Sequence, residues 1–351
     1  MRLLHTSTLQ LEDFPADKIP AYAILSHTWG DNEVGFADME RGTAEAKAGY
    51  HKIRHSCEKA VSDKHYYIWI DTCCINQSSS ADLSEAINSM YSWYQRARVC
   101  YAYLADVSAH VSPREPSSEF AESRWFKRGW TLQELIGPSH LVFFSHDWIE
   151  VGTKSDLSDI LSEITGISVG ILTGTKDLES ASVAKRMSWV NERETTRPED
   201  IAYCLMGLFN VNMPMLYGEE EKAFTRLQEE IMKHSDDESL FAWTDKDAPS
   251  TSHSGLLVRH AKNFADSGNV MPYHDQRSAP FSMSNKGLRI EFPLSPHEGD
   301  YIAALNCPAP PEYENFLGIR LKCVSSEDNQ YTRVMPQTFY EVAVRGSMKT
   351  V

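Results

Sequence analysis

The sequence has no surplus of positive charge and no long apolar run. Its 34 lysines and arginines are outnumbered by 49 aspartates and glutamates, which gives a formal net charge of −15. A surface that follows nucleic-acid phosphates needs a basic surplus, so we expect no nucleic-acid partner. No apolar run approaches the ~20 residues that a membrane helix needs, so no membrane span is expected either.

Signals for export and for disulfide bonding are also missing. The polar start of the chain runs into Glu12 and Asp13 without the apolar core of a signal peptide. The 7 cysteines are an odd number and are scattered without a C-x-x-C pair. Both features indicate a reducing compartment inside the cell, and we predict a cytoplasmic location.

Several common cofactor and catalytic motifs are absent. The chain has no G-x-G-x-x-G and no G-x-S-x-G, and the glycines within residues 170–176 are too close together for a P-loop. His51 and His55 lie four residues apart, but no matching pair of ligands follows them. We therefore expect no metal site and no bound cofactor.

What the sequence does contain is an alternation of apolar runs with helical patterns. The 351 residues are 42% hydrophobic, enough for one large or two ordinary domains. Strands are predicted at residues 22–26, 66–71, 99–104 and 140–144, with helices at 44–61, 83–94 and 130–136. This alternation predicts an α/β core over residues 1–150, a parallel sheet flanked by helices.

The rest of the chain divides by composition. Residues 151–235 are predicted to form a helical extension, and the polar stretch 236–254 is predicted to be a linker. Residues 255–351 are predicted to form a β-rich C-terminal domain, with β-like runs at 287–292, 301–305, 316–324 and 339–344.

Polar side chains stand at the ends of the first two predicted strands. Ser26 and His27 end the first strand, Asp71 ends the second, and Asn76 follows shortly after. Ligands of helix-covered parallel sheets bind beyond the carboxyl ends of the strands, so we expect these four residues near one site. Each of them also has an ordinary role open to it, such as capping a turn.

Residues 124–135 combine a carboxylate with aromatic and basic side chains in one short segment. They place Glu134 among Trp125, Trp130 and three basic residues. Indole neighbours remove water from a carboxylate and nearby cations favour its ionisation, and such opposed influences are typical of a working acid or base. The competing interpretation is a helix start whose tryptophans belong to the core. Glu85 is the second candidate carboxylate, although it also fits a helix capping box with Asp82, three residues before it.

Three blocks of the sequence resemble the signature of the fungal heterokaryon incompatibility (HET) domain. They read SHTWG at residues 26–30, WIDTCCINQ at 69–77 and RWFKRGWTLQE at 124–134. Their order and spacing agree with that family over roughly residues 20–150. The resemblance implies a fungal protein of self/non-self recognition whose activation leads to cell death.

At a more remote level, the same region is similar to TIR domains. The segment WTLQEL at residues 130–135 looks like the TIR stretch whose glutamate is catalytic in TIR enzymes that hydrolyse NAD, and that position is Glu134. The resemblance implies a TIR-like α/β core with NAD as substrate. It also implies activity in an assembled state, by self-association or with another incompatibility protein.

NAD hydrolysis requires few groups besides that glutamate. Cleavage of the nicotinamide–ribose bond passes through an oxocarbenium-like state, and a nearby carboxylate stabilises the developing charge. We assign Glu134 as catalytic, Trp29 or Trp130 as an aromatic wall, and Arg128 as the cation for the pyrophosphate. The remaining predicted substrate-binding residues are Ser26, His27, Asp71 and Asn76.

Two other functions stay open at this point. One is a non-enzymatic signalling module that kills by assembly with partners, and the other is a hydrolase of another nucleotide N-glycosidic bond. The long polar loop at residues 107–122 directly precedes the Glu134 segment. We predict that this loop becomes ordered on assembly, because long loops in compact domains are often functional.

Overall fold

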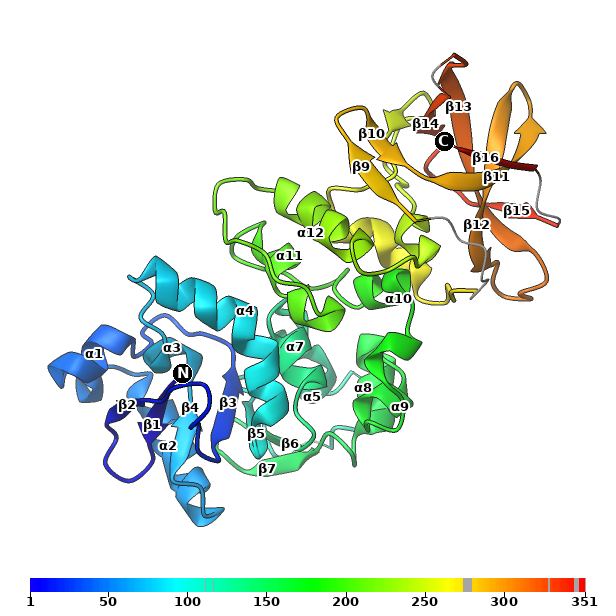
Figure 1. The fold of residues 1–351 in the computed structure, drawn as a ribbon. Coiled ribbons are helices and arrows are strands. Elements are labelled where there is room, and N and C mark those ends of the chain that lie inside the picture. The colour runs from blue at the N-terminus through cyan, green and yellow to red at the C-terminus, as the bar shows by residue number, and fades with distance from the viewer. Residues whose placement is uncertain (111, 116, 274–279, 328, 344–346, 351) are drawn as a thin grey trace. The chain divides into compact units, whose positions relative to one another are not determined.

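The computed structural model describes residues 1–351 except 111, 116, 274–279, 328, 344–346 and 351 (Figure 1). The chain separates into two compact units. The first contains Met1–Asp177 with Arg193–Thr195, and the second contains Leu178–Glu192 with Thr196–Val351. The predicted helical extension at 151–235 is therefore divided between the two units.

The first unit is built on a seven-stranded sheet with the order β2-β1-β4-β3-β5-β6-β7. The four central strands β4-β3-β5-β6 are parallel, and the outer strands β1, β2 and β7 are antiparallel to their neighbours. The strands are β1 Arg2–His5, β2 Leu11–Asp13, β3 Ala23–His27, β4 Tyr67–Trp69, β5 Val99–Tyr103, β6 Leu141–Phe144 and β7 Glu150–Thr153. The α/β core is thus confirmed, with three outer strands that were not predicted, of which β2 and β7 are the edges.

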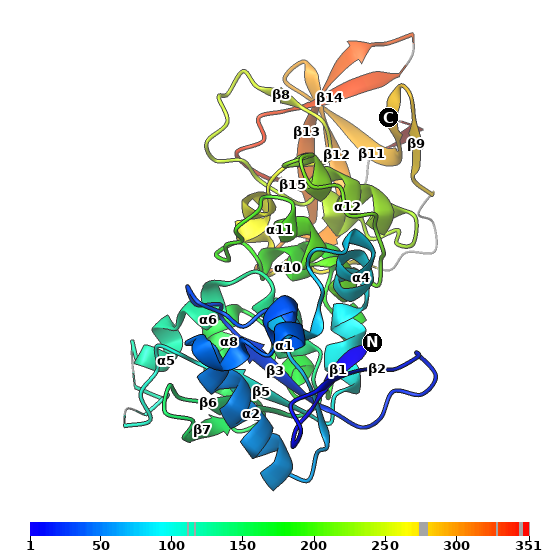
Figure 2. The ribbon, with the colours of Figure 1, turned by 90° about the vertical axis from the view of Figure 1, so that its left-hand side faces the viewer.

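The central strands are apolar because helices cover both faces of the sheet. Every residue of β3, β5 and β6 is buried, as expected for parallel strands with two covered faces. Helix α2 Tyr50–Ser62 lies on one face, and α4 Ser80–Arg96 and α7 Thr131–Ile136 lie on the other (Figures 1 and 2). The shorter helices of this unit are α1 Phe36–Arg41, η1 Ala44–Ala46, α3 Asp71–Cys74, α5 Glu119–Glu122, α6 Arg124–Lys127, α8 Ser158–Thr165 and α9 Val169–Leu172.

The strand order puts β3 at a reversal point of the chain. The chain runs from β3 to β4 on one side, and then to β5 and β6 on the other side. Right-handed crossovers in opposite directions place their helices on opposite faces. Ligands bind where the order reverses, beyond the carboxyl ends of the strands. The end of β3, where Ser26 and His27 lie, is that place.

Helix α4 begins one turn earlier than predicted. Its N-cap is Ser79, whose Oγ accepts a hydrogen bond from the Asp82 backbone N–H at 3.2 Å. The predicted capping box between Asp82 and Glu85 is therefore wrong, because Asp82 occupies the third helical position rather than the cap. The inner side of the helix buries Ile87, Met90 and Tyr94, among others.

The second unit combines short helices with a separate antiparallel sheet. Its helices are α10 Val183–Ser188, α11 Asp200–Tyr203 and α12 Lys222–Met232, with 3-10 turns η2 Leu178–Ser180, η3 Met206–Phe209, η4 Glu238–Phe241 and η5 Ala261–Ser267. The sheet has the order β16-β11-β12-β13-β14-β8, and β15 pairs with β13. Its strands are β8 His253–Ser254, β11 Glu291–His297, β12 Asp300–Pro308, β13 Phe316–Ser325, β14 Gln330–Val334, β15 Tyr340–Val342 and β16 Ser347–Thr350, and β9 Ser282–Ser284 pairs with β10 Gly287–Arg289.

The β-rich C-terminal region is confirmed by these strands. The predicted run at 339–344 corresponds to β15, although residue 344 lies outside the described residues. The prediction of a linker at residues 236–254, by contrast, is wrong for residues 240–244, which are buried. Phe241 and Trp243 are buried there, and the Trp243 indole donates to the Leu256 carbonyl oxygen at 2.7 Å. The Arg333 guanidinium stacks 3.7 Å from the Trp243 ring centroid and anchors this segment to β14.

No helix in the described part of the chain has the length and apolar character needed to cross a membrane.

We predict that Ile87→Ala lowers the free energy of unfolding by about 2–5 kcal/mol, because the side chain is buried between α4 and the sheet. Urea denaturation of the purified chain measures the change. Gln95→Ala is the matched control, since Gln95 is exposed on the same helix, and it should alter stability by less than ~0.5 kcal/mol. Equal effects of the two substitutions would contradict the packing of this helix.

Candidate active site

The last two residues of β3 connect the end of the strand to both faces of the sheet. Ser26 and His27 are both buried. Successive side chains of a strand point to opposite faces. Ser26 accordingly contacts Glu134 of α7, whereas His27 contacts Lys52 of α2. The candidate site therefore has two halves, one on each side of the same strand end.

The first half is centred on the Glu134 carboxyl, which is 3% exposed. The Ser26 hydroxyl donates a hydrogen bond to Glu134 Oε2. The same hydroxyl accepts a hydrogen bond from the Trp125 indole N–H at 2.8 Å. The Tyr94 hydroxyl also interacts with Glu134 and lies 3.0 Å from the Leu25 carbonyl oxygen, so its single proton serves one of these two acceptors at a time. Glu134 is thus enclosed by an indole, a phenol and a serine.

This enclosure changes the acidity of Glu134. Burial raises the pKa of Glu134, and the negative charge of Asp71 raises it further. The positive charge of Arg128 and the hydrogen bonds from Ser26 and Tyr94 oppose both effects, and the resulting pKa is about 7. The opposed influences predicted from the sequence are present, and burial outweighs the cation. The carboxyl can therefore change its charge near neutral pH.

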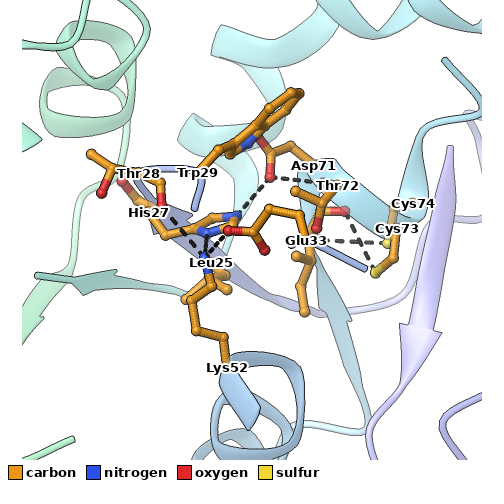
Figure 3. A network of polar contacts seen from close by, with 12 residues as sticks. Leu25, His27, Thr28, Trp29, Glu33, Lys52, Asp71, Thr72, Cys73 and Cys74 are labelled. Carbon is orange, nitrogen blue, oxygen red and sulfur yellow. Dashed lines mark hydrogen bonds and ion pairs between the residues drawn. The ribbon is translucent and has the colours of Figure 1, made fainter. Parts of the chain in front are cut away.

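The second half is centred on Asp71, the first residue of α3 (Figure 3). Asp71 Oδ1 lies 2.9 Å from His27 Nε2 and accepts from the Thr72 backbone N–H at 2.8 Å. Asp71 Oδ2 accepts from the Trp29 indole N–H at 2.8 Å. Burial alone would raise the pKa of Asp71, but the contacts with His27, Arg128 and Trp29 lower it to about 2. Asp71 is consequently a permanent anion at neutral pH.

Two residues that were not predicted extend this half. The Lys52 ammonium reaches His27 Nδ1 at 2.7 Å and pairs with the Glu33 carboxylate. Glu33 also accepts from the Gly30 backbone N–H at 2.6 Å, which holds the turn after β3. Figure 3 shows Lys52 extending from its helix toward the His27 ring. Neither residue belongs to a recognisable sequence motif.

Arg128 and Trp29 form the outer part of the site. The Arg128 guanidinium carbon lies 5.1 Å from the Trp29 ring centroid, within the range of a cation–π contact. The Trp29 side chain is 43% exposed, so its ring is available to solvent. Arg128 is held through its backbone, whose carbonyl oxygen accepts from Arg193 at 2.9 Å and from Thr131 at 2.8 Å. An exposed aromatic ring thus lies against the partly buried Asp71 carboxylate, and the charge of Arg128 acts on both Asp71 and the buried Glu134.

The structure brings together six of the eight predicted site residues: Ser26, His27, Trp29, Asp71, Arg128 and Glu134. Asn76 instead serves the turn before α4, where its side-chain oxygen accepts from the Ser78 backbone N–H and hydroxyl. Trp130 is the residue before α7, and the indole that reaches Ser26 belongs to Trp125. The substrate-binding roles of Asn76 and Trp130 therefore stay predictions.

The alternative carboxylate Glu85 lies elsewhere. Its side chain is 66% exposed and stands 4.0 Å from the N-terminal ammonium group. An exposed ion pair of this kind contributes little to stability and leaves the carboxylate in water. Of the two candidates, Glu134 is the one that lies in the cluster of site residues.

Comparison with known proteins identifies two regions of the chain. Residues 22–117 match the family described as heterokaryon incompatibility protein (HET), and residues 222–288 match a domain of unknown function, DUF8212. Over 229 residues the chain is 47% identical to the vegetative incompatibility protein HET-E-1 of Podospora anserina. That alignment covers 63% of this chain and 17% of the relative's length. No solved structure matches the chain.

We predict that the free energy of unfolding of Glu134→Gln, compared with that of the wild type, is higher at pH 8 than at pH 5. A carboxyl whose pKa is raised from 4.5 to about 7 on folding contributes stability that is present below pH 4.5 and lost as the pH rises through about 7. Glu134→Gln has no carboxyl to ionise, so it keeps its stability as the pH rises. Its free energy of unfolding should therefore gain on the order of 3 kcal/mol over that of the wild type between pH 4.5 and about 7. Denaturant melts at several pH values measure it.

Glu85→Gln is the control for this experiment, because it removes an exposed carboxylate from the same unit. Its stability relative to wild type should vary by less than ~0.5 kcal/mol over the same pH range. A pH-independent difference for Glu134→Gln would contradict the raised pKa of Glu134.

Proposed function

We propose that the chain, whose residues 22–117 match the heterokaryon incompatibility (HET) family, acts in self/non-self recognition leading to cell death, and that its first unit hydrolyses NAD. The observation that carries the enzymatic part is the buried Glu134 carboxyl, with a pKa of about 7, beside Arg128 and the exposed Trp29 ring. The resemblance of residues 130–135 to the TIR glutamate segment supports the same substrate. A TIR-like core is part of this proposal.

The proposed reaction breaks the bond between C1′ of the ribose and N1 of nicotinamide. The bonding electron pair goes to the pyridinium nitrogen, so nicotinamide leaves as a neutral molecule without a general acid. The ionised Glu134 stabilises the positive charge that develops on the ribose. Water then adds to C1′ and loses a proton, which the Glu134 carboxylate accepts. Arg128 is positioned to pair with the pyrophosphate.

Access to Glu134 is closed in this structure. Glu134 is 3% exposed, and the buried Ser26 and Tyr94 side chains contact its carboxyl. A substrate must displace neighbouring side chains to reach the carboxyl. Such a closed state suits an enzyme that would otherwise consume the NAD of its own cell.

The same burial favours the second candidate function, a non-enzymatic signalling module. In that case Glu134, Ser26 and Trp125 form a buried polar cluster that specifies the core, and killing depends on assembly with partners. A hydrolase of another nucleotide N-glycosidic bond requires the same carboxylate and differs only in the base. Assays with NAD and with a panel of other nucleotides separate these functions.

We predict that Glu134→Gln lowers NAD turnover by about 100- to 1,000-fold, the usual loss when a preorganised stabilising group is removed. Wild-type activity should rise with pH through about 7, because the ionised form of Glu134 is the active one and its pKa is about 7. Nicotinamide release measured by chromatography tests both. Glu85→Gln should retain wild-type turnover, and full activity of Glu134→Gln would end the enzymatic proposal.

We also predict that self-association activates the enzyme, so that specific activity rises with protein concentration. The loop at residues 107–122 is the proposed contact segment; residues 111 and 116 in it lie outside the described part. Arg114 in this loop pairs with Asp159 of α8 at 2.5 Å. Arg114→Gln removes this ion pair and should change how the specific activity depends on protein concentration. NAD turnover and light scattering across a dilution series measure the effect. Constant specific activity of a persistent monomer would contradict assembly gating.

A further inference from the structure

The proposed reaction gives no role to the Lys52–Glu33 ion pair, which is part of the same site. The two side chains are only 13% and 14% exposed. A largely buried ion pair gains little stability over apolar residues of the same size, because both charges lose water. What distinguishes this pair is its direct contact with His27.

The contacts of Lys52 determine which nitrogen of His27 carries a proton. A lysine ammonium has three donors and no acceptor. Lys52 Nζ lies 2.7 Å from His27 Nδ1, so that nitrogen must be the acceptor. The proton of the neutral ring is then on Nε2, which lies 2.9 Å from the Asp71 carboxylate and can donate to it. A doubly protonated ring would place an N–H against the ammonium.

We propose that Lys52 is a positioning residue of this site, which holds His27 as the neutral Nε2–H tautomer and thereby fixes the Asp71 carboxylate beneath Trp29. Its consequence for catalysis rests on the proposed NAD hydrolysis, whereas its effect on His27 does not. The charged groups around the His27 ring are Lys52 of α2, Glu33 after β3, and Asp71 of α3, and Arg128 acts on Asp71 from further out.

A chain of polar contacts joins Lys52 of α2 to the exposed Trp29 ring. Glu33 orients Lys52, Lys52 orients His27, and His27 orients Asp71, whose second oxygen receives the Trp29 indole N–H at 2.8 Å. Removal of the ammonium leaves His27 Nδ1 without this donor and allows the ring to take a second proton or to turn. The orientation of the Trp29 ring under Arg128 then loses its support.

The protonation of His27 can be measured directly in the full chain. Protein labelled with ¹⁵N-histidine gives long-range ¹H–¹⁵N spectra that distinguish the two neutral tautomers from imidazolium, and the His27 signals are those missing in His27→Gln. We expect wild-type His27 to be the neutral Nε2–H tautomer at neutral pH, because Nδ1 faces the Lys52 ammonium and Nε2 faces the Asp71 carboxylate. In Lys52→Met, Nδ1 loses its donor, so the Nε2–H signal should give way to a mixture with the other forms of the ring.

Lys59→Met is the matched control, because Lys59 lies on the same helix and also forms an ion pair, with Asp63 at 2.7 Å. It should leave the His27 spectrum unchanged. Wild-type His27 seen as imidazolium or as the Nδ1–H tautomer at neutral pH would overturn the proposal. That measurement needs no variant beyond the one used for assignment, so it decides the question even if Lys52→Met fails to fold.

Activity separates this proposal from the proposed function. In an active wild-type enzyme, Lys52→Met should lower kcat/KM for NAD by about 10- to 100-fold, the usual effect of losing a group that orients an active-site residue. Absence of NAD turnover in the wild type, with His27 behaving as stated, would remove the proposed function and leave the tautomer control by Lys52 in place. Full activity of Lys52→Met with an unchanged His27 spectrum would overturn the role of Lys52 alone.

Discussion

The geometry of the site depends on the pleat of one buried strand. At the end of β3, Ser26 and His27 point to opposite faces of the sheet because successive side chains alternate. Ser26 therefore engages the Glu134 carboxyl on one face, and His27 engages Asp71 and the α2 lysine on the other. A slip of one residue in the pairing of β3 with β5 would exchange the two faces and destroy both halves. The parallel register of the central strands is what secures the site.

The two halves give two carboxyl groups opposite acidities. Few polar groups face Glu134 and burial dominates, so its pKa rises to about 7. Asp71 is only partly buried, with its side chain 17% exposed, and its contacts with His27, Trp29 and Thr72 and the charge of Arg128 favour the anion, so its pKa falls to about 2. Pairs of carboxyl groups separated in this way are typical of sites that divide roles between them. The anion of Asp71 also helps to keep Glu134 protonated.

The sequence predicted the elements whose signal is local. The four parallel strands follow from continuous apolar runs, and helix α4 follows from apolar residues at helical spacing. Strands β1, β2 and β7 escaped prediction because they are three or four residues long and only partly buried. The predicted linker failed because Phe241 and Trp243 stand in a polar stretch, and their burial comes from contacts with Leu256 and Arg333 far along the chain.

By itself, the sequence determined the α/β class, the polar residues at the strand ends, and Glu134 as the carboxylate to examine. Only the tertiary structure decided that Trp125 rather than Trp130 contacts Ser26, and that Asn76 stays in its turn. Only the fold brought Lys52 to His27, since a lone lysine in a helix carries no pattern. The physical reason is distance along the chain: Ser26 and Glu134 are 108 residues apart, and His27 and Asp71 are 44 apart. Local propensities cannot encode such pairings, which the order and register of the sheet impose.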